Sequence, residues 1–154
     1  MLGAHILLIE DDEVLCDLIK RNLQARFHEV TSAGDAQSAL NYLRTSKFDL
    51  ILLDINLPDQ TGWEILRTAQ CEGLLPRNSV NGNEGTLPVV VLSAIRVSPR
   101  RLAEFRPLAY LPKPFPMDAL LRLAAQAAQS TKTGTQSAAS PSADEEYLPT
   151  YEEY

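Results

Sequence analysis

Cysteine and histidine are scarce in this chain of 154 residues, which contains two of each. The cysteines, Cys16 and Cys71, lie far apart in the sequence and lack the paired spacing of a metal site. This composition argues against a zinc centre and against the dense disulfide framework of a small secreted protein. We expect both thiols to be reduced residues of helices.

Long apolar runs and a basic amino-terminal stretch are also missing. No run approaches the roughly 20 apolar residues that span a bilayer, and the opening residues 1–5 do not resemble a secretory signal. A cytoplasmic protein without a membrane segment is therefore expected.

Positive charge is not in excess. The chain has 14 basic and 20 acidic residues and a net charge of −6, of which residues 130–154, with one basic and five acidic residues, contribute two-thirds. A nucleic-acid-binding surface needs a basic excess. We therefore expect no direct contact with nucleic acid.

Four short apolar runs each stop at polar residues. The runs are 6–9, 50–53, 89–92 and 109–112, and they precede Glu10-Asp11-Asp12, Asp54, Ser93 and Lys113. Near-continuous apolar runs are typical of strands buried on both faces of a parallel sheet. The carboxyl ends of such strands meet at one edge, where open sheets bind ligands. The carboxylates of Asp11, Asp12 and Asp54, a hydroxyl and an ammonium are expected to converge there.

Helical patterns separate the predicted strands. Five strands and five helices are expected in alternation, which predicts an α/β fold with a doubly wound parallel sheet. The domain should cover residues 1–129, with an extended loop at 73–87 and a last helix from Pro116 to about Gln129. Residues 130–154 contain few apolar side chains and are expected to form a disordered acidic tail.

The expected edge has the composition of a magnesium site for phosphoryl chemistry. Asp11, Asp12 and Asp54 would raise one another's pKa values if they met unaided, and a hard divalent cation such as Mg²⁺ removes that conflict. Asp54 closes its strand without an acidic neighbour and is the best nucleophile, which leaves Asp11 and Asp12 as the metal pair. Ser93 and Lys113 could hold phosphoryl oxygens.

These residues together resemble a known family. Ile9-Glu-Asp-Asp12, Asp54-Ile-Asn-Leu-Pro58 with Gly62, Leu92-Ser-Ala94 and Tyr110-Leu-Pro-Lys-Pro-Phe115 stand in the order and near the intervals of the receiver domain of two-component response regulators, from about Ala4 to Gln129. The resemblance implies a CheY-like, flavodoxin-like fold with strand order 2-1-3-4-5, an order that is known for this family.

The resemblance also assigns roles. It implies that Asp54 is the phosphoacceptor, that Asp11 and Asp12 bind Mg²⁺ (Asp12 and Asp54 directly), and that the backbone carbonyl of Asn56 is a further ligand. Ser93 and Lys113 would contact the phosphoryl group, and Tyr110 would be an aromatic switch that turns inward as Ser93 moves. Lys113-Pro114 would be a cis peptide. Phosphorylation would then remodel the face formed by the helix over 100–105, the strand over 108–111 and the last helix.

Two segments depart from the family pattern. The 73–87 loop is longer than usual, and 105–110 is shorter and lacks a Gly-Ala pair, which bears on the geometry of the Tyr110 switch. The tail carries acidic residues while arginines gather near 96–106. Ordinary solvation is one interpretation of these charges, and a tail that folds back on this face, or on a neighbour's, is the other.

The sequence leads to one main functional hypothesis and three alternatives. We expect a stand-alone response regulator that receives a phosphoryl group from a histidine kinase or phosphotransfer protein, binds a downstream protein or forms a homodimer, and is no enzyme beyond its own phosphorylation and dephosphorylation. The alternatives are a phosphorylation-independent adaptor, a fragment of a larger regulator, and a phosphohydrolase or phosphomutase. Asn56 stands where those enzymes commonly place a second aspartate, which disfavours the last.

Overall fold

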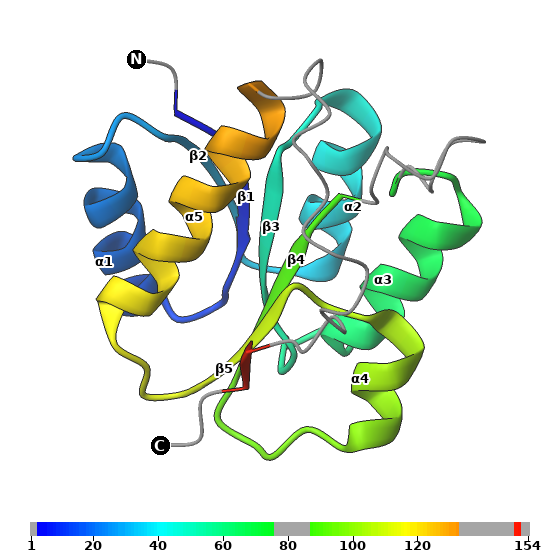
Figure 1. Ribbon diagram of the computed structural model, residues 1–154. Helices are drawn as coiled ribbons and strands as arrows, with labels where there is room; N and C mark the ends of the chain where they lie inside the picture. The colour runs from blue at the N-terminus through cyan, green and yellow to red at the C-terminus, as the bar shows by residue number, and fades with distance from the viewer. Residues whose placement is uncertain (1–2, 76–86, 133–149, 152–154) are drawn as a thin grey trace, which may run out of the picture.

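The computed structural model describes residues 3–75, 87–132 and 150–151, and strands and helices alternate within them (Figure 1). The described strands form one parallel sheet in the order β2-β1-β3-β4-β5-β6. They are β1 (His5–Ile9), β2 (Glu29–Ala33), β3 (Leu50–Asp54), β4 (Val89–Ser93), β5 (Ala109–Pro112) and β6 (Thr150–Tyr151). The helices are α1 (Glu13–Gln24), α2 (Ala36–Thr45), α3 (Gly62–Cys71), α4 (Pro99–Phe105) and α5 (Met117–Lys132).

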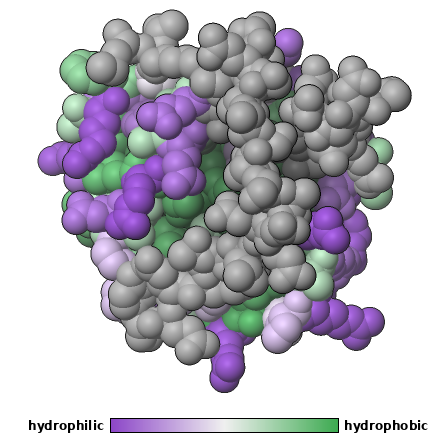
Figure 2. Space-filling model, viewed as in Figure 1, coloured by the Kyte–Doolittle hydropathy of each residue, from purple (hydrophilic) through white to green (hydrophobic). Residues whose placement is uncertain are grey.

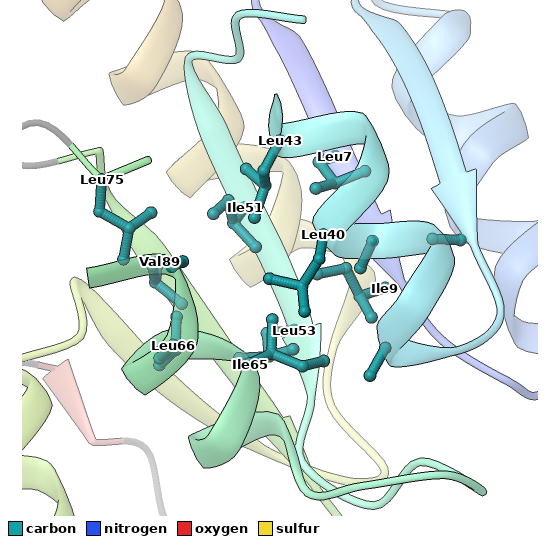
Figure 3. Packing of buried hydrophobic residues seen from close by; sticks show 14 of the residues in the cluster. Leu7, Ile9, Leu40, Leu43, Ile51, Leu53, Ile65, Leu66, Leu75 and Val89 are labelled. Atoms are coloured by element: carbon teal, nitrogen blue, oxygen red, sulfur yellow. The ribbon is translucent and has the colours of Figure 1, made fainter. Parts of the chain in front are cut away.

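The central strands bury side chains on both faces, which explains their near-continuous apolar sequences. Leu7 and Ile9 of β1 belong to the core cluster shared with α2 and α3 (Figure 3), whereas Ile6 and Leu8 belong to the cluster shared with α1 and α5. Burying one such side chain contributes about 1.5–3 kcal/mol. Two apolar layers therefore hold the sheet and fix the positions of its strand ends.

Local signals explain where the helices begin. Thr61 and Glu64 form a capping box at the start of α3, and Ser98 caps α4 with Pro99 at the first helical position. In Figure 2, hydrophilic residues stand over α1 and α5 with apolar residues between them, as expected for helices that bury one side. Among the helices of the described ranges, none is long and apolar enough to cross a membrane.

The predicted fold class is confirmed for β1–β5 and for the helices of the described chain, including the strand order 2-1-3-4-5. Two features differ from the sequence prediction. Helix α5 continues to Lys132, beyond the predicted end near Gln129, and Thr150–Tyr151 of the expected disordered tail form strand β6. The sequence of this segment does not predict a strand, and the strand forms by backbone pairing with β5. The rest of the tail and most of the 73–87 loop lie outside the described residues.

Helix α4 is short, and it is held against α3 by an aromatic and an ionic contact. The rings of Trp63 and Phe105 stack with their centroids 5.3 Å apart. The Arg67 guanidinium lies over the same Phe105 ring, 5.9 Å from its centroid, and forms a 2.8 Å ion pair with Glu104. These contacts fix the helix that leads from β4 into β5.

His28 provides a test of the folded core. Its Nδ1 accepts a 2.9 Å hydrogen bond from the Ala4 N–H, and burial, with a smaller effect of Arg26, lowers the pKa of His28 below its ordinary value of 6.5. The unfolded chain therefore binds a proton more readily than the folded protein. The contribution of His28 to stability should be complete above pH 6.5 and should be lost as the pH drops below it.

Denaturant unfolding at several pH values measures this loss. His28→Asn keeps a hydrogen-bond acceptor but cannot titrate, so part of the decline below pH 6.5 should disappear. His5→Asn, which changes the other histidine, should keep it. An unchanged decline in His28→Asn would show that other groups cause it.

Candidate functional site

The carboxyl ends of β1, β3, β4 and β5 lie next to one another because the strands pair in parallel register. Ile9 stands opposite Leu53, Asp54 opposite Leu92, and Ser93 opposite Pro112. The residues that follow or close these strands therefore share one edge of the sheet. The candidate site lies at this edge, as the sequence predicts.

Three carboxylates gather there. Glu10, Asp11 and Asp54 each place an oxygen within 4.8 Å of the other two. Glu10 and Asp54 are buried, with 3% exposure each, whereas Asp11 is exposed. The cluster thus has two buried carboxylates and one that is exposed to solvent. Its concentrated negative charge suits a hard cation.

Asp12, which the sequence predicts as one of the metal pair, is not among these three carboxylates. Its side chain caps α1 instead, accepting hydrogen bonds from the backbone N–H groups of Val14 at 3.0 Å and Leu15 at 3.1 Å. Strand β1 ends at Ile9, so Glu10 and Asp11 are the residues that reach the edge of the sheet. Of the three acids in this run, Glu10 and Asp11 are thus the two whose carboxylates lie beside Asp54.

Lys113 connects the two buried carboxylates. Its Nζ lies 2.8 Å from Oε2 of Glu10 and 3.4 Å from Oδ2 of Asp54. The Lys113 N–H donates a 2.8 Å hydrogen bond to the Ser93 carbonyl, and the Lys113-Pro114 peptide is cis, as predicted. Burial opposes the ammonium charge, but the Glu10 and Asp54 carboxylates raise the pKa of Lys113 above its ordinary value.

Glu10 is the residue that sequence reasoning missed. Burial raises its pKa to about 7, helped by the charge of Asp54 and opposed by the hydrogen bond from Lys113. Its Oε1 also accepts a 3.2 Å hydrogen bond from the Asp12 N–H. One available signal was its position directly after the apolar run 6–9, where the first residue beyond a strand should reach the edge.

The loop after β3 approaches Asp54 closely. The Asn56 N–H donates a 3.1 Å hydrogen bond to Oδ1 of Asp54, and Asn56 forms an antiparallel bridge with Thr61. A Cβ at Gly62 would lie 2.9 Å from the Asp54 carbonyl oxygen, so only glycine fits without a shift. Asn56 is thus next to the site, and the role of its carbonyl as a ligand stays a prediction.

Ser93 and Tyr110 meet at the loop between β4 and α4. The Ser93 hydroxyl donates a 2.7 Å hydrogen bond to the Ile95 carbonyl and accepts one of 3.0 Å from the Ile95 N–H. The Tyr110 hydroxyl donates to the same carbonyl at 3.2 Å, and Tyr110 is only 9% exposed. The two predicted switch residues therefore share one backbone acceptor, with the tyrosine ring turned inward.

The fold and this edge define a class of protein: a doubly wound sheet with an acidic cluster, a strand-end aspartate and a lysine at its carboxyl edge. The family model of the response regulator receiver domain matches residues 6–125, and the chain belongs to this family.

Relatives and solved structures agree with this assignment. The chain is 38% identical over 118 residues to the response regulator protein PmrA of Pseudomonas aeruginosa, covering 75% of this chain and 48% of PmrA. It thus spans about half the length of that relative. It also superposes on the Francisella response regulator 1452 receiver domain with a TM-score of 0.68 at 26% identity, covering 84% and 99% of the two chains.

A further similar structure contains a metal. The receiver domain of the sensor histidine kinase PA1611 from Pseudomonas aeruginosa, solved with a magnesium ion in its active site cleft, matches with a TM-score of 0.65 at 26% identity. The match covers 82% of this chain and 98% of that domain.

Proposed function

We propose that this receiver domain accepts a phosphoryl group on Asp54, with Mg²⁺, from a histidine kinase or phosphotransfer protein, and signals through altered protein binding. The observation that carries the proposal is the setting of Asp54. Its buried carboxylate closes β3, beside two other carboxylates and 3.4 Å from the Lys113 ammonium.

The reaction follows from these groups. An oxygen of Asp54 attacks the phosphorus of the donor, the new P–O bond forms as the bond to the donor's leaving group breaks, and that group departs with the electron pair. Lys113, already beside Asp54, offsets the negative charge that develops on the phosphoryl oxygens. The product is an acyl phosphate, which water can later hydrolyse.

The residues fit Mg²⁺. The three clustered carboxylates carry more negative charge than Lys113 alone can offset, and oxygen donors are the ligands that Mg²⁺ prefers. Asp11, Asp54 and the carbonyl of Asn56 would hold the ion, while Glu10 stays paired with Lys113. When bound, Mg²⁺ neutralises charge on the carboxylates and on the incoming phosphoryl group. The magnesium ion in the similar PA1611 domain supports this assignment.

Ser93 is the residue that would transmit phosphorylation. Its hydroxyl donates to the Ile95 carbonyl, which also accepts from Tyr110. A phosphoryl group on Asp54 offers a stronger, charged acceptor for the Ser93 hydroxyl. Loss of the Ser93–Ile95 hydrogen bond would then change the conformation of the loop before α4 and, with it, the hydrogen bond between Ile95 and Tyr110.

The remaining parts of the proposal concern context. We infer that the downstream partner of the chain is a protein bound at the face of α4, β5 and α5, and that the chain does not turn over external phosphate esters. The coverage of PmrA, 48%, shows that a related receiver domain occurs in a longer regulator.

Mass spectrometry after incubation with a small-molecule phosphodonor tests the proposal. With Mg²⁺ the protein should gain one phosphoryl group, and peptide mapping should locate it on the peptide that contains Asp54. A chelator should prevent the gain. No mass change with any donor would favour the phosphorylation-independent adaptor instead.

Asp11 and Asp12 make a matched pair for the metal. Asp11→Asn should weaken Mg²⁺ binding by at least about tenfold, because it removes a charged ligand of the cluster. Asp12→Asn should bind Mg²⁺ like the wild type and should keep its stability, since asparagine caps helices as well as aspartate does. Calorimetric titration with Mg²⁺ measures both affinities. A larger loss in Asp12→Asn would restore the role that the sequence predicted for Asp12.

A further inference from the structure

Strand β6 occupies the free side of β5. It pairs with β5 in parallel, with Thr150 opposite Ala109 and Tyr151 opposite Tyr110, and Figure 1 shows it beside β5 at the end of the sheet. Without β6, β5 would be an edge strand whose unpaired N–H and C=O groups can accept another strand. The last described segment of the chain therefore covers a backbone edge of the domain.

The connection between β5 and β6 is long enough for this pairing. Parallel neighbours need a crossover that returns the chain to the same end of the sheet. Helix α5, with 16 residues, spans about 24 Å. The 17 residues of 133–149 can reach at most about 56–61 Å when extended. The length of the chain therefore permits β5, α5 and β6 to form one crossover unit.

Charge complementarity supports the same pairing. The arginines lie just before β5, around α4: Arg96, Arg100, Arg101 and Arg106. Among the described carboxylates, only Glu104 forms an ion pair with one of them, Arg101. The segment that contains β6 has the opposite charge, with acidic residues at 144–146 and 152–153. Attraction between the two would favour docking at low salt.

We propose that residues 144–154 are an intramolecular ligand of the β5 edge, where they cover the face of α4, β5 and α5. Among the described residues, only Thr150 and Tyr151 pair with β5, so the contact can open. A protein that binds this edge must displace the segment first. Residues 144–154 would thus compete with a protein partner for binding to that face. The docking is measured in the unphosphorylated protein, so it is tested separately from the function of Asp54.

Hydrogen exchange of the β5 amides in the full chain measures directly whether β6 is docked. The Leu108 N–H donates to Val89 of β4, so the alternate amides of Ala109 and Leu111 face the β6 side. In a variant with Thr150→Pro and Tyr151→Pro, β6 loses its donors to β5 and its backbone is restricted by the proline rings. The strand that covers the Ala109 and Leu111 amides should therefore be destabilised. Exchange at Ala109 and Leu111 should accelerate by about tenfold if the segment is docked for nine-tenths of the time. Exchange at Leu108 should not change.

Two controls make this experiment decisive. Thr135→Pro with Gln136→Pro places the same two prolines elsewhere in the tail and should leave the exchange unchanged. A synthetic peptide of residues 144–154, added to the Thr150→Pro and Tyr151→Pro variant at low salt, should slow exchange at Ala109 and Leu111 again. Equal exchange in wild type and variant would overturn the proposal. Protection that depends on protein concentration would also overturn it, because the segment would then come from a second copy.

Discussion

Asp54→Asn is expected to abolish the gain of a phosphoryl group. The amide keeps the shape of the carboxylate but lacks the anionic oxygen that attacks phosphorus. The substitution also removes negative charge from the cluster with Glu10 and Asp11, so the structure should tolerate it. Incubation with Mg²⁺ and a small-molecule phosphodonor, followed by intact-mass measurement, should show complete loss of the modified species.

Asp59→Asn is the matched control for this variant. Asp59 follows β3 in the same loop, but its carboxylate accepts hydrogen bonds from the backbone N–H groups of Ala36 and Gln37 at the start of α2. These bonds lower the pKa of Asp59, chiefly through Ala36, and they have no part in the cluster. Phosphorylation should therefore persist in Asp59→Asn. A modified species that persists in Asp54→Asn would place the acceptor on another residue.

The sequence predicts which strand ends meet at this edge because the ends of the apolar runs can be located in it. The apolar runs before Asp54, Ser93 and Lys113 are buried on both faces, so each run ends where the chain leaves the core. Parallel topology then brings the three ends to one edge without any knowledge of side-chain contacts. Asp54 and Lys113 duly lie 3.4 Å apart, although 59 positions separate them in the sequence.

The acidic pair is harder to predict because three acids stand in a row. Which two reach the edge depends on where β1 ends and where α1 begins, and a shift of one residue changes the assignment. Asp12 lies two residues before Val14, where the helical stripe starts, and a capping aspartate is expected just before such a stripe. That signal could have separated Asp12, the cap, from Glu10, the partner of Lys113.

Strand β6 could not be predicted from local pattern. Two residues show no periodicity, and their pairing partner β5 is distant in the sequence. The end of α5 was equally difficult, because the alanine- and glutamine-rich stretch after Leu123 has good helix propensity and no proline or glycine to stop it before Lys132. Both features depend on contacts or helix propagation that no short sequence pattern marks, so they could not be predicted locally.

Lys113→Met should slow phosphorylation of Asp54 by about 10²–10³-fold, because no ammonium would then offset the charge that develops on the phosphoryl group. The same change should cost about 1–3 kcal/mol of stability at neutral pH, since the buried Glu10 loses the partner that lies 2.8 Å away. Lys47→Met, which changes an exposed lysine, should alter neither quantity. Denaturant unfolding without Mg²⁺ and the time course of phosphorylation measure the two effects.

Glu10→Gln in the Lys113→Met background separates the two roles of the lysine. Burial raises the pKa of Glu10 to about 7 from 4.5, so the folded protein binds this proton more tightly than the unfolded chain does. The contribution is therefore complete below pH 4.5 and is lost as the pH rises toward 7. The neutral glutamine should recover stability at neutral pH, while phosphorylation stays slow because the ammonium is still missing. If the double variant did not recover stability, the Glu10–Lys113 pair would not be the source of the lost stability. A wild-type rate of phosphorylation in Lys113→Met would show that the lysine has no part in the mechanism.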